Sequence, residues 1–285
     1  MDKRAETPET EALSRMQLDP DIQEETRSLA SVGAGLSQAR AADTAAPTST
    51  AILPLNVSSG AHRPSRGTVA LATRAGGLNK FREMTTKFYQ KAFLDPQLDP
   101  FIRSHDDPHG ERFASWIAEK MGLGKPWTEE RQTRAVCPFA AKGHSFDTPH
   151  DRSSAHFAAW HSPKRSDSKW GQHFKLDDSR VWMRLHFWSA REVGLFESAP
   201  DFMDYYIRFI GHFVSVYERT APPFARESAR WSAIAANTER YLSNGRRMDD
   251  VIGLSLSAAL AQLPEHERTY TGSNAYVKLW PYELG

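Results

Sequence analysis

The spacing of apolar residues predicts helices from about residue 76 onward. Between residues 76 and 93 they recur at mostly three- and four-residue spacing, which is the period of one face of an α-helix: Leu78, Phe81, Met84, Phe88 and Phe93. A Gly-Gly pair precedes this segment, and "DPQLDP" follows it with two prolines. Glycine and proline interrupt helices, so we expect one helix between these breakers.

The same period predicts helices in six later segments, and no segment shows the strict alternation of a half-buried strand. The stretch at 125–150 is predicted to be a loop because Pro, Gly and Asp are scattered through it. The fold class expected from this pattern is all-α. The six segments are residues 109–121, 151–161, 176–196, 200–218, 226–243 and 249–263.

Aromatic residues are unevenly distributed and suggest a boundary. None of the eighty residues before Phe81 is Phe, Trp or Tyr, and residues 31–66 are rich in Ala, Ser, Thr and Pro with Asp43 as the only acid. Segments without large apolar side chains cannot offset the entropy lost on ordering. We therefore predict a disordered arm over residues 1–66, a helical domain over 67–222 and a C-terminal helical extension over 223–285.

Charge and cysteine content exclude several classes of function. Lys and Arg number 36 against 35 Asp and Glu, for a net charge of +1, so nothing indicates binding to nucleic acid or to an anionic membrane. Cys137 is the one cysteine, which rules out an intramolecular disulfide. No apolar run approaches the roughly 20 residues that span a bilayer. We expect a cytoplasmic protein; organelle import is the alternative, because residues 31–66 are poor in acids.

The residues alone leave the chemistry open. The chain has no Gly-rich phosphate loop, CxxC, HExxH or GxSxG motif. Cys137 is more typical of a small buried hydrophobe than of a nucleophile. Four histidines follow one another at separations of six, six and five residues: His144, His150, His156 and His161. None of these separations gives the i, i+4 pair on a helix that is typical of a zinc site. A haem requires only one axial histidine on one side of its iron, so a haem site stays possible.

Several segments, in order, resemble the truncated haemoglobins, and group II of that family most. "GGLNKFREMTTKFYQKAFLDPQLDPF" is similar to the family's opening, with a Gly-Gly pair followed by Phe-Tyr in one helix. "GERFASWIAEKMGLGKPWTEER" resembles the distal helix, "HSPKR" the signature of the proximal iron ligand, "DDSRVWMRLHFW" the next helix with its tryptophan, and "DYYIRFIGHF" the last helix. The resemblance covers about residues 76–217 and implies a globin-like core with long loop insertions and extra C-terminal helices.

The resemblance implies a site for haem b. His161 would be the iron ligand, with its other ring nitrogen held by a backbone carbonyl. Tyr89 and Trp182 would direct hydrogens at a bound ligand on the opposite, distal face. Other residues would surround the porphyrin: Phe101 and Phe113 as apolar walls, Arg112 and less clearly Arg165 at a propionate, and His109 either exposed at a helix start or closing the sixth iron position.

The function implied is binding of dioxygen or another diatomic ligand, for sensing or redox chemistry rather than bulk transport. An enzymatic version is nitric oxide dioxygenation or a peroxidase-like reaction; the dioxygenation would need a separate reductase. The alternative from another class is a globin-shaped interaction or sensor protein that does not use haem.

Overall fold

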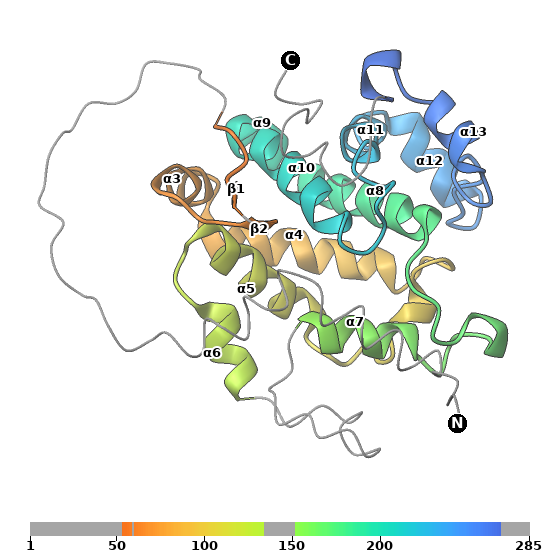
Figure 1. Ribbon diagram of the computed structural model, residues 1–285, viewed down its shortest axis with the longest axis horizontal. Coiled ribbons are helices and arrows are strands. Elements are labelled where there is room, and N and C mark those ends of the chain that lie inside the picture. The colour runs from red at the N-terminus through yellow and green to blue at the C-terminus, as the bar shows by residue number, and fades with distance from the viewer. Residues whose placement is uncertain (1–52, 59, 134–151, 269–285) are drawn as a thin grey trace, which may run out of the picture.

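Helices dominate the computed structural model, which describes residues 53–58, 60–133 and 152–268 (Figure 1). The all-α class predicted from the apolar spacing is therefore confirmed. One antiparallel hairpin pairs β1 (Val57–Ser58) with β2 (Ala61–His62). The helices are α3 (Arg66–Arg74), α4 (Gly77–Ala92), α5 (His109–Met121), α6 (Pro126–Gln132), α7 (Arg152–Trp160), α8 (Leu176–Glu192), α9 (Leu195–Ser198), α10 (Pro200–Val214), α11 (Phe224–Trp231), α12 (Ala235–Ser243) and α13 (Leu256–Ala261), with 3₁₀ turns η1 (Asp99–Phe101), η3 (Asp167–Lys169) and η4 (Glu265–Glu267). None of these helices combines the length and the apolar character needed to cross a bilayer.

The strongly periodic helices were predicted well, and the weaker ones were not. The loop predicted at 125–150 contains α6, which begins at Pro126; proline suits a first helical turn because its missing N–H has no partner there anyway. The single helix predicted at 226–243 is two helices, since Ile234 is extended. The helix predicted at 249–263 is reduced to α13.

The core lies between α4, α5, α8 and α10. Helix α4 packs against both α5 and α8, and its residues Phe81 and Met84 are fully buried. Helix α5 approaches α4 closely at Gly110, where an added Cβ would lie 3.3 Å from the backbone nitrogen of Thr86. The Thr85 hydroxyl donates to the Gly110 carbonyl at 2.7 Å. This close contact sets the spacing of the two helices.

A short hairpin and a helix cap precede α3, within the region predicted as an arm. In residues 53–66 the hairpin buries His62, whose Nε2 lies 2.6 Å from the hydroxyl of Tyr205. Ser65 caps α3 by accepting a hydrogen bond from the Thr68 backbone N–H. The imidazole ring of His62 thus joins this part of the chain to α10. Residues 1–52 lie outside the described part.

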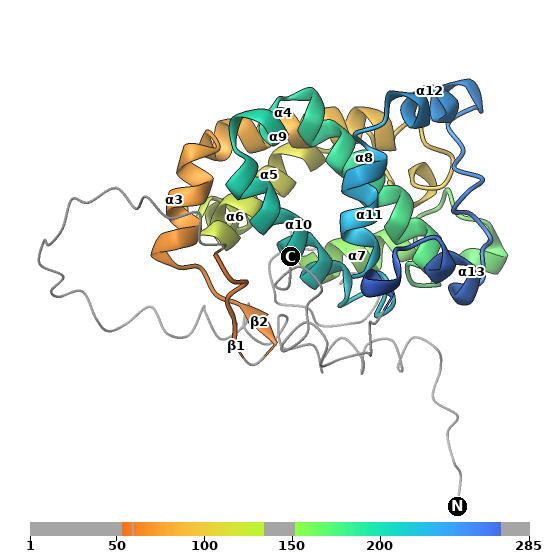
Figure 2. The ribbon, with the colours of Figure 1, turned by 90° about the horizontal axis from the view of Figure 1, so that it is seen from above.

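The C-terminal helices share a core with the helices before them. Helix α11 packs on α8 and α10, and a second apolar cluster joins Phe88 of α4 and Leu185 of α8 to Trp231, Tyr241 and Val251. Both views place α11, α12 and α13 together, at the opposite end of the molecule from α3 (Figures 1 and 2). Residues 224–267 are thus part of the same folded unit rather than an attached domain.

Two buried arginines of α8 hold this C-terminal part. Arg184 is 2% exposed and donates to Glu227 at 2.5 Å and to Asp250 at 2.7 Å. Arg180 is 1% exposed, donates to Gln262 at 2.8 Å and lies 4.4 Å from the ring centre of Phe224. Buried guanidinium groups are costly unless they are paired. The register of α11 on α8 is therefore fixed by charge as well as by apolar packing.

Removing the carboxylate between these arginines is expected to destabilise the fold strongly. Glu227→Ala leaves two buried cations short of a partner, and we expect a loss of about 3–5 kcal/mol in the free energy of unfolding. Asp249→Ala breaks an exposed pair with Arg247 and is the control, with an expected change within about 0.5 kcal/mol. Urea denaturation measures both; equal, small losses would contradict this account.

Candidate functional site

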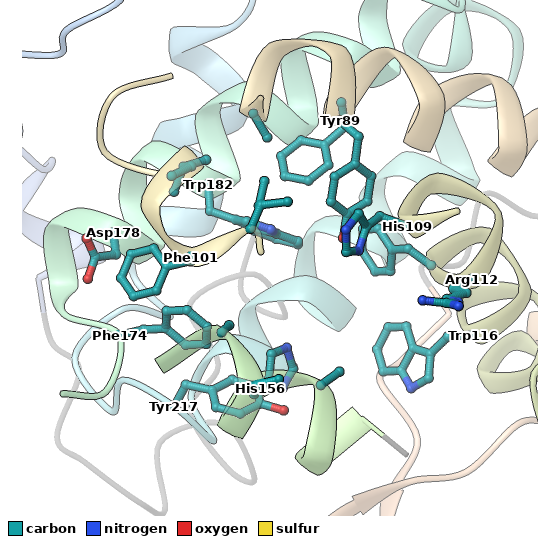
Figure 3. A pocket seen from close by; sticks show the side chains of 18 of the residues that line it. Tyr89, Phe101, His109, Arg112, Trp116, His156, Phe174, Asp178, Trp182 and Tyr217 are labelled. Carbon is teal, nitrogen blue, oxygen red and sulfur yellow. The ribbon is translucent and has the colours of Figure 1, made fainter. Parts of the chain in front are cut away.

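A cavity of about 400 Å³ lies between α4, α5, α7, α8 and α10, and most of its lining is apolar. Figure 3 shows it from close by, with Tyr89 and Trp182 on one side and His156 across from them. Its lining includes Phe88 and Tyr89 of α4, His109, Arg112, Phe113 and Trp116 of α5, His156 and Ala159 of α7, Trp182 of α8, Phe213 of α10, and Phe101, Phe174 and Tyr217 between helices.

Tyr89 presents a hydrogen to this cavity. Its position on α4 follows from the helical period, one residue after the buried Phe88. Burial raises the pKa of Tyr89 well above its usual value, so its hydroxyl keeps its proton at any physiological pH. Within the described part of the chain that hydroxyl has no hydrogen-bond partner. Tyr89 is thus a neutral donor available to a ligand.

Trp182 is a second donor in the same wall. Its indole lies 5.4 Å from the ring centre of Phe88 and stacks on His186 at 4.9 Å with an interplanar angle of 5°. Its Nε1–H also lacks a hydrogen-bond partner among the residues the structure describes. The side chains packed on both sides of the indole fix its orientation, so this hydrogen has a defined position.

His109 and Arg112 line the cavity but are already engaged. The His109 Nε2–H donates to the Ser104 carbonyl at 2.8 Å, and its ring lies 5.2 Å from that of Tyr89. Burial lowers the pKa of His109, although the Ser104 carbonyl opposes this shift. Arg112 pairs with Asp107 at 3.7 Å and with Glu130 at 3.4 Å. To bind a metal through Nε2, His109 would first have to lose its bond to Ser104.

On the α7 side the cavity is lined by His156 and not by His161, whereas His109 lines it from α5. Helix α7 carries His156 five residues before His161, a rotation of about 140° around a helix axis, so the two cannot face the same way. Ala155, Ala158 and Ala159 line the cavity beside His156. The ring centre of His156 lies 5.5 Å from that of Phe174 and 4.4 Å from that of Tyr217.

His161 is held away from the cavity lining. Its Nδ1–H donates to the Phe157 carbonyl at 2.8 Å, as the resemblance implies for an iron ligand, but its Nε2 faces Gly171, where an added Cβ would lie 3.4 Å away. The ring packs against Phe157 and Trp170, with ring centres 4.0 Å and 4.3 Å away. His161, which the "HSPKR" motif predicts as the iron ligand, is thus not among the residues that line this cavity.

Arg165 also lies away from the cavity lining. Its Nη1 donates to the carbonyls of Trp160 at 2.9 Å and Gln172 at 2.5 Å, and its guanidinium lies 4.4 Å from the ring centre of Phe101. These bonds tie the end of α7 to the loop after it. Arg165 is not among the residues that line the cavity, whereas six other predicted site residues line it together: Phe101, Phe113, Arg112, His109, Tyr89 and Trp182.

Sequence reasoning missed His156 and several aromatic walls of the cavity: Phe88, Trp116, Trp127, Phe174, Phe213 and Tyr217. For α7 the signal was available: Ala159 lies four residues after Ala155 and three after His156, which are the spacings of one helix face. Cys137, His144 and His150, which were weighed for catalysis and zinc, lie outside the described residues. Among those described, no three His, Cys, Asp or Glu side chains cluster as a metal site would require.

Comparison of the chain with models of protein families, with curated proteins and with solved structures finds no match. The site must therefore be interpreted from its own geometry.

Protonation of the His186 ring beneath Trp182 is expected to make stability depend on pH. Burial lowers the pKa of His186 to about 3, whereas an unfolded histidine titrates near 6.5. The unfolded chain therefore binds more protons between these values, and stability falls as pH falls through this window, by up to about 1.4 kcal/mol per pH unit for one histidine.

His186→Phe is expected to remove the contribution of His186 to the pH dependence of the free energy of unfolding. The measurement is the free energy of unfolding by urea between pH 6.5 and 4 for the parent and the variant. His62→Phe should act similarly, because burial lowers the pKa of His62 to about 3 as well. Parallel curves for parent and variant would show that folding does not lower the pKa of His186.

Proposed function

We propose that this cavity binds haem b, with His156 as the axial ligand on one side and Tyr89 and Trp182 on the other. The observation that carries the proposal is the position of one histidine across an apolar cavity from two unpartnered hydrogen-bond donors (Figure 3). The proposal keeps the cofactor that the truncated-haemoglobin resemblance implies and changes the ligand from His161 to His156.

The donor set fits this group better than it fits a bare metal ion. A haem iron needs one protein ligand because the porphyrin supplies four nitrogens, whereas a protein-only site needs three or four. The volume of about 400 Å³ is within the range of small-molecule and cofactor sites. Ala158 and Ala159 keep the α7 wall flat beside His156, which suits a planar ligand.

The bound haem would supply an iron that takes a diatomic ligand opposite the histidine. The side chains above it act by orientation: Tyr89 and Trp182 aim two hydrogens at a position where a ligand with partial negative charge gains from them. The apolar walls around these donors strengthen the interaction because they exclude water.

The rim supplies cations for the two carboxylates of the porphyrin. Arg103 and Arg112 both border the cavity, and Arg112 already holds carboxylates at 3.7 and 3.4 Å. A haem carboxylate would take the place of one of these partners.

A diatomic ligand held tightly by Tyr89 and Trp182 suits sensing or redox chemistry, with electrons from a separate reductase, better than transport.

Replacing the two histidines in turn tests the ligand. Apo protein reconstituted with haemin should show a sharp Soret band, and His156→Ala should abolish the histidine-ligated spectrum. Added imidazole, which can fill the space left by the ring, should restore that spectrum. His161→Ala is the matched control and should leave it unchanged, since its Nε2 faces Gly171.

The opposite result, loss of the spectrum in His161→Ala alone, would overturn the assignment to His156 and favour the "HSPKR" motif. No Soret band in the parent chain would overturn haem binding itself and favour a globin-shaped protein that works without the cofactor.

Removing the Tyr89 hydroxyl is expected to weaken ligand retention. A charge-assisted hydrogen bond contributes about 1.5–3 kcal/mol, so Tyr89→Phe should speed dioxygen dissociation from the haem-loaded protein by about 10- to 150-fold. Tyr217→Phe removes a hydroxyl on the His156 side of the same cavity and is the control. Stopped-flow dissociation rates that are equal for both variants would contradict the assignment of Tyr89 to the ligand face.

A further inference from the structure

A chain of three contacting rings runs from the cavity wall into the core. Trp182 lines the cavity and stacks on His186 at 4.9 Å with planes 5° apart. His186 Nε2 lies 2.8 Å from the hydroxyl of Tyr206 on α10. Both His186 and Tyr206 are fully buried. The contact thus connects a cavity that solvent and ligands enter with a phenol that neither reaches.

The hydrogen bond has one sensible direction. Burial raises the pKa of Tyr206 and lowers that of His186, so both groups are neutral. Tyr206 has no other acceptor within the described chain, so its hydroxyl donates to His186 Nε2. The hydrogen on Nδ1, which has no hydrogen-bond partner there either, then lies among aromatic rings, which attract an N–H weakly.

We propose that Trp182, His186 and Tyr206 form a redox relay that carries an oxidising equivalent from the cavity to Tyr206. Trp182 passes one electron to a one-electron oxidant in the cavity, and Tyr206 then passes one electron to oxidised Trp182. The nature of that oxidant, peroxide-treated haem, rests on the proposed function; the relay itself does not.

The step balances because the phenol proton has a place to go. When Tyr206 loses an electron, its O–H bond breaks and the proton moves to His186 Nε2, where a new N–H bond forms. The products are a neutral tyrosyl radical and an imidazolium, and the oxidant is reduced by one electron. The rings of Trp182, Phe88 and Phe113 around His186 favour a cation there, which eases a protonation that burial otherwise opposes.

The neighbouring residue of the same helix provides a matched control. Tyr205 makes an equivalent bond to a buried histidine, His62, at 2.6 Å. The aromatic contacts of His62 are with Tyr205, Phe209 and Phe213, and phenylalanine is hard to oxidise. Tyr205 is therefore a buried, histidine-bonded tyrosine with no tryptophan link through its histidine to the cavity.

The experiment is pulse radiolysis of the full chain without haem, using azide radicals, which oxidise tryptophan preferentially. The transfer from tryptophan radical to tyrosyl radical is followed by transient absorption. Trp182→Phe should remove part of this transfer, and the remainder comes from other tryptophans such as the exposed Trp170. Tyr206→Phe should remove the same part, and Tyr205→Phe should remove none.

Three further comparisons separate the relay from a structural bond. The double variant of Trp182→Phe and Tyr206→Phe should lose no more transfer than either single variant, because both act on one path. Transfer in the parent should slow in D₂O, and His186→Phe should abolish the same part because it removes the proton acceptor.

The relay is overturned if Tyr206→Phe loses no more transfer than Tyr205→Phe, or if the losses in the double variant add. Because no haem is present, a chain that fails to bind haem can still support the relay. A chain that binds haem can equally refute it.

Discussion

Helix α8 is buried on almost every side, and the rest of the molecule depends on how it meets this constraint. Arg180 and Arg184 share one face, and Trp182 and His186 share another about 200° away, because residues two apart lie on nearly opposite faces of a helix. The first face is charged and is neutralised by Glu227 and Asp250 of the C-terminal part. The second is aromatic and forms the cavity wall. The ion pairs on one side therefore fix the position of the indole on the other.

This arrangement explains why the cavity can be both apolar and specific. Tyr89 and Trp182 are held by packed rings rather than by hydrogen bonds, so their polar hydrogens stay available in a site with few competing groups. Both side chains are only partly buried and line the cavity, so these donors are open to whatever fills it. An apolar cavity that retains two of them, with a histidine opposite, is typical of a site that a ligand completes.

The sequence predicted the fold where side chains are large and regularly spaced, as in α4, α5, α8 and α10. It failed where small or polar residues are buried, as with Thr68 and Ala72 of α3 and with His62. The site was predicted in the same uneven way. Tyr89 and Trp182 lie on long helices whose faces are set by periodicity, and both line the cavity. His161 follows the last turn of a short helix, and the chain turns there because the Arg165 N–H donates to the Ser162 carbonyl. The motif alone therefore could not fix the direction of the His161 side chain.

The central claim is that one haem occupies the cavity between α7 and the Tyr89–Trp182 wall. Its most direct test is a titration of the full apo chain with haemin, followed by the Soret absorbance and by quenching of tryptophan fluorescence, since Trp116, Trp127 and Trp182 line the cavity. The account predicts that both signals saturate together at one haemin per chain. Absorbance that rises without saturation, or fluorescence that is not quenched, would contradict it.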